Sequence, residues 1–235
     1  MTEHISSAYD RDLEYLIALI MKMGGLVEDA IRDSANSFET QDIELAESVR
    51  SKDKDIDALE LKINDEAAKI IALRAPVSKD LRAILTVLRL AASLERIGDY
   101  SKNIAKRTSA LIEMPNRSST NSSLRRMSRE VQSMLKDVLD AYVHADPKIA
   151  EDVRQRDREV DEMYNALFRE FLTFMMEDPR QITACMHLHF MAKNIERMGD
   201  LTTNMAEQVI YLVTGEMPGE DRPKSDSTAY LSELD

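Results

Sequence analysis

In each half of the sequence, two pairs of acidic residues spaced four apart belong to segments that repeat, and such pairs are candidate metal ligands. Residues four apart lie on the same face of a helix, so each pair would present two carboxylates side by side. Glu95 and Asp99 return as Glu196 and Asp200, each 101 positions later. A second set recurs at an offset of 104. The eight candidate ligands are Asp53, Asp57, Glu95, Asp99, Asp157, Asp161, Glu196 and Asp200.

The residues around these pairs repeat as well, which identifies the chain as a duplication. The segment LERIGD at 94–99 is answered by IERMGD at 195–200, and NIA at 103–105 by NMA at 204–206. Asn103 and Asn204 lie one helical turn beyond the acidic pairs, and each could add an oxygen ligand.

The spacing predicts that four carboxylates converge in each half. In an antiparallel helix pair, residues equally far from the turn lie level with each other, and the acids are symmetric about Pro76 and about Asp178–Pro179. Carboxylates brought together repel, and burying them unpaired is costly. Cations or basic side chains would neutralise them. An all-oxygen cluster suits Mg²⁺, Mn²⁺, Ca²⁺ or iron.

The alternative is that these acids are ordinary solvated or ion-paired helix charges. Asp and Glu make up 43 of 235 residues, so acidic pairs four apart also arise by chance. Nearby basic residues could pair with them, namely Lys54, Arg96, Arg158 and Arg197. Gly98 and Gly199 fall inside the predicted helices, where glycine costs about 1 kcal/mol relative to alanine. They therefore indicate close helix approach, whether for a metal cluster or for packing alone.

Composition limits the function classes. Lys and Arg number 31 against 43 Asp and Glu, for a net charge of −12, which disfavours general binding to nucleic acid or anionic membranes. The single Cys185 excludes an internal disulfide and fits a reducing compartment. The N-terminus has no secretory signal pattern, and the longest apolar run, Leu16–Met21, is too short to span a bilayer. We expect a soluble cytoplasmic protein.

Apolar residues recur at intervals of three and four along most of the chain, and no convincing strand pattern appears, which predicts an all-α fold. Asp42 and Asp146 are expected to cap helices, and the first hairpin should turn near Arg74–Pro76. We predict two tandem, similar three-helix bundles over residues 1–115 and 124–214. Residues 116–123 (NRSSTNSS) are the expected linker, and residues 215–235 an expected disordered tail.

Together, these motifs resemble the PhoU family. The resemblance rests on the two LERIGD-type segments, on DKDID at 53–57 and DREVD at 157–161, and on RAPVSKDLR at 74–82. It implies two similar three-helix bundles whose E(D)xxxD motifs bind multinuclear metal clusters in some members. Those motifs fall on the eight acids named above. The identity of the ion, whether iron, Mn, Mg, Ca or Zn, is left open.

The resemblance also implies a role without enzymatic activity. PhoU-like proteins are thought to couple the phosphate ABC transporter to a sensor histidine kinase, repressing the phosphate regulon when phosphate is plentiful, and to restrain uptake. We therefore expect a regulator at the inner face of the membrane, forming a homodimer. Two alternatives stay open: a metal-dependent enzyme or metal store using the carboxylates, and a structural helical adaptor. No catalytic base or nucleophile can be nominated from the sequence.

The turn between the second and third helices is a candidate partner surface. RAPVSKDLR has no counterpart in the second half, where residues 177–182 read EDPRQI. Arg74, Asp80 and Arg82 are therefore candidate contacts for the transporter or the kinase. The alternative is that these charges only neutralise nearby acids at helix ends.

Overall fold

The regular structure of the chain is helical throughout the residues that the computed structural model describes, 2–111 and 118–219. The elements are α1 (Thr2–Thr40), α2 (Ile43–Arg74), α3 (Lys79–Leu111), α4 (Ser118–His144), α5 (Pro147–Glu177), a short 3-10 helix η1 (Pro179–Gln181) and α6 (Ile182–Thr214). The predicted all-α class is confirmed. No helix in the described ranges has an apolar stretch that could cross a membrane.

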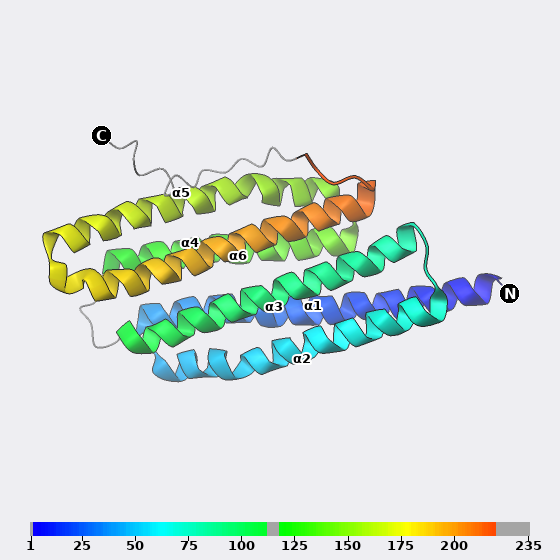
Figure 1. Ribbon diagram of the computed structural model, residues 1–235, viewed down its shortest axis with the longest axis horizontal. Coiled ribbons are helices and arrows are strands. Elements are labelled where there is room, and N and C mark those ends of the chain that lie inside the picture. Colours follow the sequence, from blue (N-terminus) through cyan, green and yellow to red (C-terminus); the bar gives the residue numbers. More distant parts are fainter. Residues whose placement is uncertain (1, 112–117, 220–235) are drawn as a thin grey trace.

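Two three-helix bundles, α1–α3 and α4–α6, lie side by side, as predicted (Figure 1). Helix α3 packs along α6 and α1 along α4, whereas α2 and α5 lie on the outer sides of the pair. The contact between α3 and α6 is antiparallel. Arg89, early in α3, donates to Gln208, late in α6, at 2.6 Å, and Arg107 near the end of α3 meets His187 near the start of α6 at 3.2 Å.

The same local structure starts the second helix of each bundle. Asp42 caps α2 by accepting from the backbone N–H of Leu45, and Asp146 caps α5 in the same way. The preceding residues, Gln41 and Ala145, have left-handed φ values of 55° and 51°. The duplication is therefore visible in the backbone as well as in the sequence, and both predicted caps are confirmed.

The predicted linker is shorter than expected. Helix α4 begins at Ser118, so residues 118–123 belong to the helix although their composition favours a loop. Packing explains the difference: Thr120 and Asn121 are buried, and Thr120 donates to Glu170 of α5 at 2.9 Å. The remainder of the predicted linker and most of the predicted tail, residues 220–235, lie outside the described residues.

The two bundles share one hydrophobic core. A continuous cluster of buried apolar side chains draws residues from each of α1 to α6. Side chains such as Leu16, Ile84, Met127 and Phe171 are almost fully buried in it. Burial of this apolar surface is the main stabilising term, and it acts across the bundle boundary as well as within each bundle.

Two adjacent glycines of α1 provide a test of the contact between the bundles. A methyl group at Gly24 would lie 2.5 Å from Cδ1 of Leu139 in α4, whereas nothing lies within 4 Å of one at Gly25. We expect Gly25→Ala to raise the free energy of unfolding by about 1 kcal/mol through helix propensity. Gly24→Ala must also displace the buried Leu139, at an overpacking cost of about 1–3 kcal/mol. Urea denaturation of both variants checks this, and equal stabilities would contradict the close α1–α4 contact.

Candidate carboxylate centres

The structure brings the four predicted acids of the first half together between α2 and α3. We call Asp53, Asp57, Glu95 and Asp99 the first-half acidic cluster. Burial raises the pKa of Glu95, and the carboxylate of Asp99 adds to this, with smaller contributions from Glu60, Asp57 and Asp53. Burial followed by the charge of Asp53 likewise raises the pKa of Asp57. These carboxylates are thus close enough to destabilise one another's ionised forms.

A lysine that the sequence analysis missed neutralises part of this cluster. The ammonium group of Lys102 lies 2.5 Å from Oδ2 of Asp53 and 3.4 Å from Oδ1 of Asp99. Asp53 is the buried member, with a side chain only 4% exposed. Lys102 follows Asp99 by three residues, so its position on the same helix face was the signal available in the sequence.

The second-half acidic cluster, formed by Asp157, Asp161, Glu196 and Asp200, is more deeply buried. Only Asp200 is not in the buried class. Lys193 donates to Oε1 of Glu196 at 2.8 Å, one turn before the acidic motif. Burial raises the pKa of Glu196, and Lys193 opposes this shift. The other carboxylate oxygen of Glu196, Oε2, is buried without a hydrogen-bond partner among the described residues.

The two glycines in the repeated motif allow the close helix approach that their position predicted. A methyl group at Gly98 would lie 3.0 Å from Ile56 Cδ1 and 3.8 Å from Asp53 Oδ1. In the second half, one at Gly199 would lie 3.3 Å from Val160 Cγ1 and 3.5 Å from Asp157 Oδ1. The same motif glycine therefore faces the same buried aspartate in both halves.

The ligand atoms are of the type that a hard cation prefers, because every cluster member offers carboxylate oxygens. Oε2 of Glu196 is moreover buried without a hydrogen-bond partner among the described residues. The side chains are not arranged around an ion: across the described ranges, no three His, Cys, Asp or Glu residues are positioned to hold a metal. Asn103 and Asn204, the predicted additional ligands, are both exposed. The eight-residue metal set remains a prediction.

The basic residues suggested as alternative partners are not the ones that contact the clusters. Lys54, Arg96 and Arg197 are exposed, and Arg158 pairs with Glu162 at 3.5 Å. Lys102 and Lys193 take this role instead. They occupy different positions in the repeat, so the duplicated pattern could not reveal them.

The turn between α2 and α3 presents a mixed surface. Arg74 pairs with Asp12 of α1 at 2.9 Å, and its side chain is 31% exposed. The guanidinium of Arg82 lies 5.0 Å from the ring centroid of Tyr211 in α6, so this side chain is part of the contact between the bundles. Asp80 is exposed, as are the neighbouring apolar side chains of Leu73 and Val77, at 76% and 72%.

Comparison with known proteins gives consistent relationships over almost the whole chain. A family model described as "PhoU domain" matches residues 20–108 and 124–209, which lie in the first and second bundles. A phosphate-specific transport system accessory protein PhoU homolog of Rhizobium meliloti (strain 1021) is 45% identical over 231 residues, covering 98% of each chain. Its namesake in Caulobacter vibrioides is 46% identical, covering 96% of this chain and 98% of its own.

Solved structures show the same architecture. The crystal structure of PhoU from Pseudomonas aeruginosa aligns with a TM-score of 0.85 at 36% identity, covering 88% of this chain and 100% of that one. The phosphate transport system regulatory protein PhoU from Streptococcus pneumoniae aligns with a TM-score of 0.83 at 28% identity, covering 90% of this chain and 99% of that one.

Removing the ammonium group of Lys102 should destabilise the protein. In Lys102→Met, the buried carboxylate of Asp53 loses its ionic partner, and we expect unfolding to become easier by on the order of 1–2 kcal/mol. Lys106→Met, one turn further along α3 at an exposed position, serves as the control and should change stability by less than about 0.5 kcal/mol. Urea denaturation at pH 7 compares them. Coincident midpoints for the two variants would show that the Lys102–Asp53 contact contributes nothing.

Proposed function

Because this chain belongs to the PhoU family, we propose that it regulates phosphate uptake and phosphate-regulon signalling from the cytoplasmic side of the membrane. The observation that carries the proposal is the end-to-end identity of 45% to a protein named a phosphate-specific transport system accessory protein. The regulatory protein from Streptococcus pneumoniae, with the same fold, supports it. In this role the chain acts through protein contacts and population shifts, without catalysing a reaction.

The proposed partners are components of the phosphate ABC transporter and a sensor histidine kinase, with the chain itself acting as a homodimer. Coupling between them requires a surface that each partner contacts differently in its two states. The α2–α3 turn is our candidate for that surface: Leu73 and Val77 expose apolar area beside Arg74 and Asp80. Arg82 would hold the turn against α6 through its contact with the ring of Tyr211.

We also propose that the two acidic clusters bind divalent or trivalent metal ions: iron, Mn, Mg, Ca or Zn. When bound, the ions would neutralise carboxylates that otherwise repel one another. Asp53, Asp57, Glu95 and Asp99 would hold the ions of the first half, and Lys102 would have to move away from Asp53 to admit them. Asp157, Asp161, Glu196 and Asp200 would hold those of the second half, where Glu196 already has a buried, unpartnered oxygen.

Metal binding is tested by elemental analysis of the untagged protein after incubation with Mn²⁺ or Fe²⁺ and gel filtration. We expect stoichiometric metal in the wild type and its loss in the variant Glu95→Ala/Asp99→Ala/Glu196→Ala/Asp200→Ala, because each site loses two carboxylate ligands. Circular dichroism must show that the variant keeps its helices. A wild type without metal, or a folded variant that retains it, would remove the metal sites from the proposal.

The regulatory role is tested in a bacterial host that lacks its own family member and carries a phosphate-starvation reporter. At high phosphate, we expect the wild-type chain to restore repression, and Leu73→Asp/Val77→Asp to fail because charges at the turn disrupt apolar contacts with a partner. Leu61, another exposed leucine of α2 at 65%, lies away from the turn. The variant Leu61→Asp is therefore the matched control, and it should restore repression of the reporter like the wild type. A reporter that stays derepressed with well-expressed wild-type protein would contradict the proposed role, and normal repression by the double variant would move the partner surface elsewhere.

A further inference from the structure

A hollow of about 170 Å³ lies in the first bundle between α1 and α2, where α3 approaches at Gly98. We call it the first-half hollow. Its lining combines apolar side chains, among them Ala30 and Ile56, with the carboxylates of Asp29 and Asp33. Asp55 and Asp53 line it as well, so the hollow adjoins the first-half acidic cluster. Such a lining suits a ligand with an apolar stem and a positively charged end, as in a long basic side chain.

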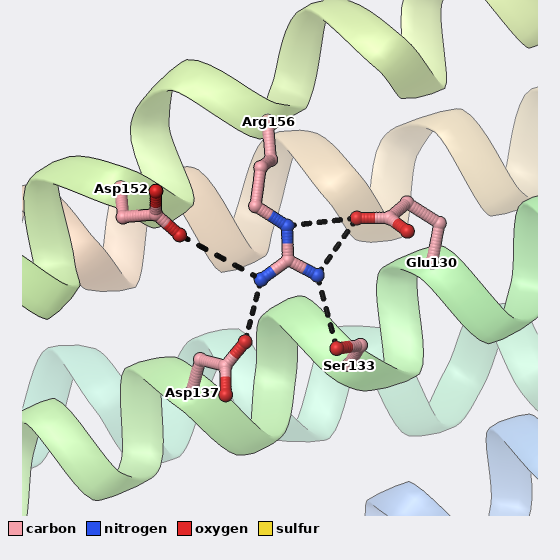
Figure 2. Close-up of polar contacts among 5 residues, drawn as sticks. All are labelled: Glu130, Ser133, Asp137, Asp152 and Arg156. Atoms are coloured by element: carbon pink, nitrogen blue, oxygen red, sulfur yellow. Dashed lines mark hydrogen bonds and ion pairs between the residues drawn. The ribbon is translucent and has the colours of Figure 1, made fainter.

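The corresponding place in the second bundle holds a guanidinium group (Figure 2). Arg156 projects from α5 toward α4, where its Nε lies 2.8 Å from Oε1 of Glu130, its Nη1 2.5 Å from Oδ2 of Asp137, and its Nη2 2.9 Å from Oγ of Ser133. Desolvation opposes the charge, but the hydrogen bonds to Asp137 and Glu130 raise the pKa of Arg156. The second bundle therefore shows how this position binds a planar cation.

The two places are related by the duplication. The offset of 104 residues that links the caps Asp42 and Asp146 also links α1 to α4 and α2 to α5. It pairs Asp33 with Asp137, Lys52 with Arg156 and Ala30 with Met134. One acid, Asp33 or Asp137, is thus present in both bundles, whereas Asp29 corresponds to Ser133 and Glu130 to Leu26. Arg156 and the buried Met134 of the second bundle are replaced in the first. Met134 is fully buried and Arg156 partly so, but Ala30 is small and Lys52 is exposed.

Within the part of the chain that the structure describes, Asp29 and Asp33 pair with one basic residue, Arg32 of the same helix. Arg32 pairs with Oδ1 of Asp29 at 2.7 Å and with Oδ1 of Asp33 at 2.9 Å, and its side chain is 49% exposed. The Arg32–Asp29 pair is exposed on both sides, and pairs of this kind contribute little to stability, whereas the side chain of Asp33 is 16% exposed. Each carboxylate has a second oxygen, Oδ2, to offer an incoming donor.

Lys52 does not take the place of Arg156 in the first bundle. It lines the first-half hollow, yet among the described residues it forms no hydrogen bond or ion pair. A lysine ammonium is compact and strongly hydrated, whereas a guanidinium offers a planar fork of donors and is more weakly hydrated. An arginine from outside would make the contacts that Arg156 makes internally in the second bundle.

We propose that the first-half hollow is a docking site for one arginine side chain of a protein partner, with its stem against Ala30 and Ile56 and its guanidinium on Asp29 and Asp33. The second bundle carries its own copy of this ligand as Arg156, and the first bundle leaves the position open. The site is separate from the α2–α3 turn, and its existence does not depend on the proposed regulatory role.

The test titrates ¹⁵N-labelled full-length protein with arginine blocked at both ends, as the N-acetyl amide, and follows backbone amide shifts. We expect saturable shifts confined to residues 26–33 and 49–56. The dissociation constant should be on the order of a few millimolar, because a single side chain makes few contacts. The equivalent blocked lysine should bind at least roughly tenfold more weakly, because it lacks the planar fork.

Three variants tie the shifts to the hollow. Lys52→Arg should supply the guanidinium from the chain itself, as Arg156 does, and Ala30→Met should fill the space, as Met134 does. Both should abolish binding of the blocked arginine while leaving the protein folded. Lys54→Arg makes the same chemical change at an exposed position outside the lining, and it should bind like the wild type.

Several results would overturn the proposal. These are the absence of localised shifts at 20 mM blocked arginine, equal binding of blocked lysine, or unchanged binding in both Lys52→Arg and Ala30→Met. Free L-arginine binding about a hundredfold more tightly than the blocked form would also overturn it, since the site would then serve the free amino acid. The phosphate reporter is a separate readout, so failure here and failure of the regulatory role can be told apart.

Discussion

The close approach of α3 to α2 at Gly98, and of α6 to α5 at Gly199, is the constraint on which the rest of the structure depends. A side chain at either glycine would press on a core residue of the neighbouring helix and come close to a buried aspartate. The approach therefore places Asp53 and Asp157 inside helix interfaces, where an unpaired charge is costly. A nearby cation offsets this free-energy cost. In this structure Lys102 lies beside the first-half acidic cluster and Lys193 beside the second-half acidic cluster.

Much of the architecture could be predicted from the sequence because it depends on local signals. Apolar periodicity predicted the helices, Asp42 and Asp146 their caps, and the symmetry of the acids about Pro76 the convergence of the first-half acidic cluster. The predictions failed where tertiary packing overrides composition, as in residues 118–123. They also missed Lys102 and Lys193, since these contacts depend on side-chain reach and appear only once in the repeat.

The two halves keep one backbone plan and differ in how they place charge. Lys102 of the first half corresponds to Thr203 in the second, and Lys193 of the second corresponds to Ala92 in the first. Each cluster thus receives its ammonium group from a different turn of the helix. Similarly, the position filled by Arg156 in the second bundle is a hollow in the first. Divergence after duplication has altered the polar contacts while the apolar core has stayed continuous.

The shared core of the two bundles has a consequence for each repeat taken alone. A polypeptide of one repeat would leave the apolar sides of its first and third helices in water, which favours association with a second copy. The antiparallel contact of α3 with α6 is the arrangement that a two-fold axis between identical subunits would give. The duplicated chain thus contains within itself the arrangement that two identical subunits would form. Because both halves belong to one chain, each can differ from the other, as Lys102 differs from Thr203.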